Sequence, residues 1–127
     1  MKAARFYDRH DIRVEDIPAP EAAAGEVLIK VAWCGICGTD LHEYLDGPIF
    51  CPKHGHPHPI SGEDSPVTLG HEFSGVVEAL GEGVDDLKVG DHVVVEPYII
   101  ADDVYTGPES KDYHLSKDMN FIGLAGR

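Results

Sequence analysis

The sequence of 127 residues lacks the apolar stretch that a membrane-spanning segment requires. No run approaches the roughly 20 consecutive apolar residues that cross a bilayer as a helix. Its first residues include Lys2 and Arg5 but have neither the apolar region nor the cleavage site of a secretory signal. We therefore expect no membrane partner.

Basic residues are also scarce. Ten Lys and Arg stand against 23 Asp and Glu, for a formal net charge of −13. Nucleic-acid binding needs clustered positive charge, so this balance excludes that class of partner. The acidic pairs Asp85-Asp86 and Asp102-Asp103 are interpreted as solvated loops.

Cysteine is scarce too, with three residues, whereas eight histidines are many for a chain of this length. Three cysteines cannot pair completely, and no secretory signal accompanies them. The composition therefore favours a reducing, cytoplasmic location and a metal site over a disulfide framework.

The length predicts one domain, residues 1–127. Residues 1–7 and 11–17 are predicted to form a hairpin of two strands, and residues 26–33 form the clearest strand because apolar side chains alternate along them. Residues 38–45 are expected to be helical, with Thr39 as the N-cap.

The second half has fewer regular elements. Residues 49–66 are predicted to be a long loop, and residues 67–80 a strand in which Gly70 and Gly75 mark bulges. Residues 92–96 are expected to be a buried strand, residues 101–118 a loop and residues 120–124 a further strand. Short strands separated by Gly and Pro turns predict a mainly β fold with short helices, arranged as a small, partly open barrel.

The first chemical motif is Cys34-x-x-Cys37. It fits half of a structural zinc site, a redox pair, or one functional cysteine beside an inert one. The strand prediction favours the third interpretation. Cys34 at the strand end is expected to be a small buried apolar residue. Cys37 lies at the entrance to the helix, where a thiolate is better stabilised.

The second motif is His71-Glu72, preceded by Gly70. A thiolate and an imidazole are good zinc ligands, and an acidic neighbour can orient a ligating histidine. The adjacent glycines allow two backbone segments to approach closely.

The long loop contains a separate group, Cys51, His54, His56 and His58, which is able to bind metal adventitiously. We favour the simpler interpretation of a mobile loop near the mouth of a site. The isolated histidines His10, His92 and His114 are given no role.

These motifs together resemble the N-terminal part of the zinc-containing medium-chain alcohol dehydrogenases. Within that family the resemblance is strongest to the bacterial 2,3-butanediol (acetoin-forming) dehydrogenases. The matching segments are MKAAR at 1–5, WCGICGTDLHEY at 33–44, GPIF at 47–50, SPVT at 65–68, GHEFSGVV at 70–77, GEGV at 81–84, VGD at 89–91 and VVVEP at 93–97.

The resemblance implies a GroES-like catalytic domain that holds one catalytic zinc. It makes Cys37 and His71 zinc ligands and Glu72 the carboxylate close to the metal. Asp40 would orient a ligand. Thr39 would supply the hydroxyl that meets the substrate alcohol, and His42 would relay its proton.

Two departures from the family narrow the expectation. Residues 101–112 contain no cysteine, whereas many relatives bind a structural zinc there, so no structural zinc is expected. The chain also has no G-x-G-x-x-G fingerprint: Gly81 and Gly83 begin one, but Asp86 occupies the third glycine position. We therefore expect an N-terminal fragment that lacks the Rossmann domain, with a third protein ligand beyond Arg127.

The expected function is that of the zinc-binding catalytic domain of an NAD-dependent dehydrogenase acting on small alcohols or diols, with 2,3-butanediol and acetoin as the leading pair. Sorbitol-like polyols and threonine are the alternative substrates. The fragment alone is expected to be inactive and to self-associate as a homo-oligomer through exposed apolar surface. The alternatives are a non-catalytic GroES-like interaction module and a redox or zinc protein that uses Cys34 and Cys37.

Overall fold

A computed structural model describes residues 1–101 and 112–126. The acidic pair at 102–103 and most of the loop predicted for 101–118 lie outside these ranges. The elements in chain order are β1 (Lys2–Asp8), β2 (Asp11–Asp16), β3 (Val27–Gly35), α1 (Gly38–Asp46), β4 (Val67–Thr68), β5 (Glu72–Leu80), β6 (His92–Val94), β7 (Tyr98–Ile99), a 3₁₀ turn (Tyr113–Leu115) and β8 (Asn120–Phe121).

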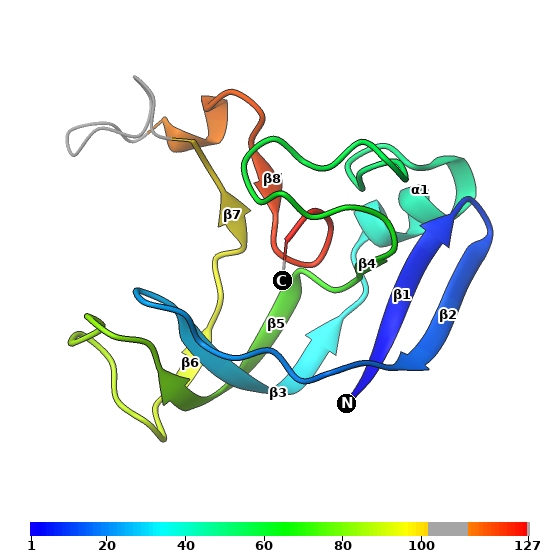
Figure 1. The fold of residues 1–127 in the computed structure, drawn as a ribbon. Helices are drawn as coiled ribbons and strands as arrows, with labels where there is room; N and C mark the ends of the chain where they lie inside the picture. Colours follow the sequence, from blue (N-terminus) through cyan, green and yellow to red (C-terminus); the bar gives the residue numbers. More distant parts are fainter. Residues whose placement is uncertain (102–111, 127) are drawn as a thin grey trace.

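The described strands form three separate sheets, in the orders β2-β1-β4, β3-β5-β6 and β7-β8. Every strand pair is antiparallel. Figure 1 shows the three sheets arranged around the centre of the molecule, with α1 at the end of the β1–β2 hairpin. The mainly β fold is confirmed, and no closed barrel forms among the described residues. None of the described helices has the length and apolarity to cross a membrane.

The β1–β2 hairpin forms as predicted, with Lys2 opposite Asp16 and Phe6 opposite Ile12. Its turn contains His10 in the left-handed region at φ 60°. The ring of His10 contacts Tyr44 edge-on at a centroid distance of 5.1 Å, and its backbone N–H donates to the Tyr44 carbonyl. The turn of the hairpin therefore packs against α1.

The longest strand pairing joins β3 to β5, from Val27 opposite Leu80 to Gly35 opposite Glu72. Two register irregularities interrupt it, between Leu28 and Ile29 and again before Trp33. The alternation predicted for residues 26–33 is therefore not maintained. Trp33, the last residue of the predicted strand, is 81% exposed.

The burial predicted for residues 92–96 is wrong. Only His92–Val94 are strand, and Val94 is 85% exposed. The physical reason is position: β6 is the last strand of its sheet and pairs only with β5. A β-branched run at a sheet edge keeps its strand propensity without being covered.

Helix α1 begins at Gly38, as predicted, and extends one residue further than expected, to Asp46; its N-cap is Cys37 rather than Thr39. The backbone N–H of Cys37 donates to Oδ2 of Asp40 at 2.9 Å, which satisfies the free amide at the helix start. The helix ends at Gly47, whose N–H donates to the carbonyl of Glu43 at 2.9 Å.

The inward face of α1 is unusual because its buried residues are two acids, Asp40 and Glu43. Its apolar residues Leu41 and Leu45 are exposed. Hydrogen bonds rather than apolar contacts therefore attach this helix to the rest of the fold.

The apolar core is small and lies between β1, β4 and the segment after β8. Its buried members are Phe6, Cys51, Val67 and Leu124, against which Leu69 and Phe121 pack. Residues 49–66 form the long loop that was predicted, without helix or strand. Cys51, however, is part of the core rather than of an open loop.

Gly70 and Gly123 cross at close range beneath this core. Both adopt the left-handed region, at φ 119° and 85°, and the N–H of Gly70 donates to the carbonyl of Gly123 at 3.1 Å. A Cβ on Gly123 would overlap the Gly70 carbonyl, and one on Gly70 would lie 2.7 Å from Sγ of Cys34. This crossing joins the segment before β5 to the last residues described, as Figure 1 shows at the lower end of β8.

Gly123→Ala is expected to lower the free energy of unfolding by at least about 2 kcal/mol, since it adds a backbone overlap to the cost of a left-handed alanine. Gly83→Ala is the matched control, because Gly83 has φ 86° but nothing within 4 Å of its Cβ position. That control should lose only about 1 kcal/mol. Urea unfolding measures both, and equal losses would contradict the crossing.

Candidate metal centre

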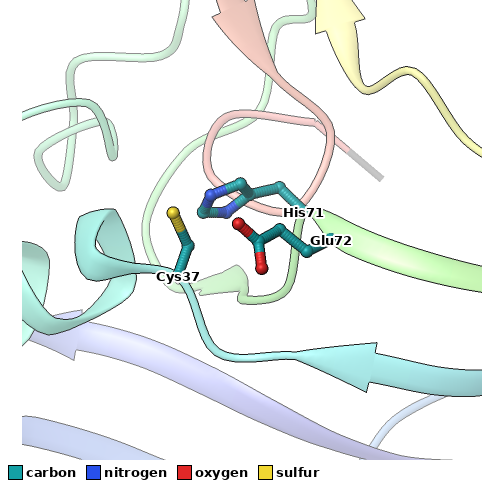
Figure 2. Close-up of side chains that lie close together, drawn as sticks. All are labelled: Cys37, His71 and Glu72. Atoms are coloured by element: carbon teal, nitrogen blue, oxygen red, sulfur yellow. The ribbon is translucent and has the colours of Figure 1, made fainter.

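Three potential metal ligands converge between α1 and β5. The ligand atoms of Cys37, His71 and Glu72 all lie within 4.8 Å of one another. Figure 2 shows the three side chains pointing toward one another, Cys37 from the start of α1 and the other two from the start of β5. Across residues 1–101 and 112–126 no other group of three such side chains is found.

The β3–β5 pairing accounts for this convergence. It ends with Gly35 opposite Glu72, so Cys37 follows the strand end by two residues while His71 directly precedes β5. A Cβ on Gly35 would lie 3.0 Å from Oε2 of Glu72. The glycine therefore leaves room for the Glu72 carboxylate to lie over the strand end.

Asp40 lies beside the ring of His71. Its side chain is 8% exposed, and Nδ1 lies 3.4 Å from Oδ1 of Asp40. The two atoms are within ion-pair distance but do not meet hydrogen-bond geometry, and neither has another partner. The other carboxylate oxygen of Asp40 accepts the Cys37 N–H. One acid thus contacts both Cys37 and His71, as expected for a residue that orients ligands.

The donor set fits zinc. A thiol, an imidazole and a carboxylate are the three side-chain types that zinc binds, and three protein ligands with an open position are typical of catalytic zinc. With Nδ1 turned to Asp40, Nε2 is the nitrogen of His71 left for a metal. The unpartnered buried atoms of Asp40 and His71 also indicate a pair that a bound cation would orient.

The two other predicted site residues differ in their placement. Thr39 lies beside the cluster, since the Cys37 thiol donates to its hydroxyl at 3.6 Å. His42 is one helical turn further on and 69% exposed, with Nδ1 3.9 Å from Oδ2 of Asp46. The structure therefore brings Thr39 to the cluster and leaves His42 at the surface.

The burial expected for Cys34 is wrong, because this cysteine is exposed. Its thiol nevertheless lies over Gly70, and desolvation by burial is the first cause that raises the thiol pKa, with Asp40 and Glu72 adding negative charge. Cys34 also lines an apolar cavity of about 550 Å³ together with Leu41, Tyr44 and Leu69.

Cys51 and the loop histidines do not form a metal group. Cys51 is buried, and burial raises the pKa of its thiol further than the neighbouring Glu43 does. His58 is also buried and contacts the carbonyl of Asp118 at 3.1 Å, while His54 contacts the carbonyl of Ser65 at 3.2 Å. These hydrogen bonds fix the loop instead of binding a metal.

Two residues near the site were missed by sequence reasoning. The ring of Phe121 contacts that of His71 at a centroid distance of 5.8 Å, tilted by 32°. Glu43 is fully buried three residues after Asp40. That spacing places both acids on one helix face, and it is the sequence feature from which the burial of Glu43 could have been predicted. Nothing local in the sequence signals the contact of Phe121.

The chain belongs to the alcohol dehydrogenase family. The family model that matches it, for the alcohol dehydrogenase GroES-like domain, covers residues 23–126.

Curated relatives point to one group within the family. The chain is 75% identical over 126 residues to the (R,R)-butanediol dehydrogenase of Neisseria gonorrhoeae, which covers 99% of this chain and 35% of that protein. It is 56% identical to the (R,R)-butanediol dehydrogenase of Bacillus subtilis, with the same coverage. The chain thus spans about a third of the length of these relatives.

Solved structures agree with the fold. The crystal structure of 2R,3R-butanediol dehydrogenase from Bacillus subtilis matches with a TM-score of 0.88 at 54% identity, covering 98% of this chain and 34% of that one. An alcohol dehydrogenase from Escherichia coli complexed with NADH matches with a TM-score of 0.76 at 29% identity, covering 99% and 33%.

The thiol environments predict an order of alkylation by iodoacetamide. A raised pKa leaves less thiolate at a given pH, so Cys34 should react more slowly than it does in the urea-unfolded chain, and the difference should shrink as pH rises. The thiol of Cys51 is buried and its pKa is raised further than that of Cys34, so Cys51 should react last. Peptide mass spectrometry follows each site. Equal rates for Cys34 in the folded and unfolded chains would contradict this assignment.

Proposed function

We propose that residues 1–127 form the zinc-binding catalytic portion of an NAD-dependent dehydrogenase that converts a small secondary alcohol or diol, with 2,3-butanediol and acetoin as the pair. The observation that carries this is the convergence of Cys37, His71 and Glu72 in a chain of the alcohol dehydrogenase family. In this proposal Cys37 and His71 are zinc ligands, and Glu72 is the carboxylate close to the metal.

The remaining residues act on the substrate proton. Bound zinc would supply Lewis-acid chemistry that makes an alcohol O–H easier to deprotonate. Thr39, whose hydroxyl lies beside the Cys37 thiol, accepts the hydrogen bond of the substrate alcohol. His42 follows Thr39 on the next helical turn, and its exposed ring passes the proton to water. NAD, when bound, would supply the nicotinamide that accepts a hydride from the substrate carbon.

The diol assignment follows the relatives. Those with 75% and 56% identity are (R,R)-butanediol dehydrogenases, whereas a sorbitol dehydrogenase of Bacillus subtilis is 38% identical. A small diol therefore ranks above a sorbitol-like polyol.

The other expectations stay proposals. We propose one zinc site and no structural zinc, and residues 102–111, where relatives would bind the structural ion, lie outside the described ranges. A cytoplasmic location and the absence of a nucleic-acid partner follow from the composition alone. Homo-oligomer formation is supported by the exposure of Trp33, Ile36 and Val94.

Zinc binding tests the site. We expect the chain to bind one zinc ion, measured by competition with a chromophoric chelator. Cys37→Ala and His71→Ala should abolish binding, and Asp40→Asn should weaken it by about 10- to 100-fold, since outer contacts of ligands contribute that much. Cys34→Ala is the matched control and should keep the ion. A folded chain with a zinc ratio near zero would instead favour a non-catalytic GroES-like module.

A chimera tests the reaction. Residues 1–127 would replace the matching third of the Bacillus subtilis (R,R)-butanediol dehydrogenase, which is 56% identical over this stretch. We expect NADH formation from (R,R)-2,3-butanediol, its loss in Thr39→Val, and none from the 127-residue chain alone. Steady turnover by the chain alone would contradict its expected inactivity. Preference of the chimera for sorbitol would contradict the diol substrate.

A further inference from the structure

Glu43 has a position that the proposed reaction does not use. It is an acid with 0% exposure in the middle of α1. Its Oε2 accepts the backbone N–H of Ile49 at 2.9 Å, and its Oε1 accepts that of Phe50 at 2.5 Å. The thiol of Cys51 also donates to it. One buried carboxylate thus holds three consecutive residues after the helix.

The space around this carboxylate is restricted. A Cβ on Gly47 would lie 2.6 Å from Oε2 of Glu43. The chain after α1 therefore turns back tightly over the acid, and the backbone amides of Ile49 and Phe50 would lose their acceptor if the acid were removed. Because both carboxyl oxygens accept a backbone N–H, the side chain of Glu43 and the two residues that it binds fix one another's positions.

The anchored segment is connected to His71 through a series of contacts. The carbonyl of Phe50 accepts the side-chain amide of Asn120 at 2.9 Å, and its ring contacts Phe121 edge-on at 6.0 Å between centroids. The ring of Phe121 in turn contacts that of His71, as described above. The path from Glu43 to His71 therefore runs through one hydrogen-bonded loop and two ring contacts.

We propose that Glu43 is a positioning residue for the metal centre: by holding residues 49–51 it fixes Phe50 and Phe121 as the aromatic wall that orients the ring of His71. The proposal rests on the proposed function for the role of His71 as a ligand. Asp40 fixes His71 through Nδ1 from one side, and the wall fixes the plane of its ring from the other. Both acids lie on the same face of α1, so one helix sets both constraints.

The test compares Glu43→Gln with Glu78→Gln, an equal charge change at an exposed position of β5. The first readout is the ring resonances of His71 in the metal-free chain, and the second is zinc affinity. Glutamine places an amide donor where a backbone N–H now donates. Glu43→Gln should therefore shift the His71 resonances and weaken zinc binding about fivefold, less than the direct contact of Asp40 because it acts through other residues. Glu78→Gln should change neither.

A purely structural role predicts a different result. Glu43→Gln would then lower the melting temperature while the His71 resonances and the zinc affinity stay unchanged, and that outcome overturns the proposal. If the chain binds no zinc even without substitution, the proposed function fails, yet the His71 resonances still decide the role of Glu43.

Two further variants keep the test decisive if Glu43→Gln does not fold. Glu43→Asp keeps the charge and shortens the side chain, and it should give a smaller shift of His71 in the same direction. Asn120→Ala interrupts the path at its other end, and its effect on His71 should be non-additive with that of Glu43→Asp because both act along one path. Additive effects, or no shift in either variant, would contradict the path.

Discussion

The register of β3 against β5 is the constraint on which the site depends. With Gly35 opposite Glu72, the segment that carries Cys37 leaves β3 at the point where His71 and Glu72 enter β5. A slip of one residue would turn every side chain of one strand to the opposite face and separate the thiol from the imidazole. The two register irregularities along β3 show that the ladder adjusts in its middle while this end stays paired. Gly35 suits the arrangement, because a Cβ there would lie 3.0 Å from Oε2 of Glu72 and would push on its carboxylate.

Helix α1 follows from the same end of β3 and reverses the usual pattern of an amphipathic helix. A surface helix normally buries apolar side chains and exposes its acids. Here Asp40 and Glu43 face inward, whereas Leu41 and Leu45 are exposed. Each buried acid is matched to nearby donors or to His71, which is the condition for burying charge at low cost. The helix is thereby held by directional contacts that fix its rotation, and its rotation sets where the Cys37 thiol points.

Local pattern predicted the elements better than their burial. The hairpin, the first long strand, the helix and the long loop were all expected near their observed bounds, since turn residues and alternation are local signals. The pairing of Cys37 with His71 came from resemblance, and the structure brings both together with Glu72. The exposure of Cys34 and Val94 and the burial of Cys51 were missed. Whether these side chains are covered depends on segments distant in sequence, such as the Leu124 turn over Cys51, and no local pattern encodes that contact.

The charges around the cluster argue for a cation at its centre. Asp40 contacts both His71 and the amide of Cys37, and Glu72 lies within the ligand group itself. The thiols of Cys34 and Cys51 both have raised pKa values: burial is the first cause for both, and the negative charge of Asp40 contributes to both. A divalent cation bound among Cys37, His71 and Glu72 would be the largest local charge and would offset that of the nearby carboxylates. Asp40 and Glu72 therefore lie where they would favour a cation, as the proposed zinc site requires.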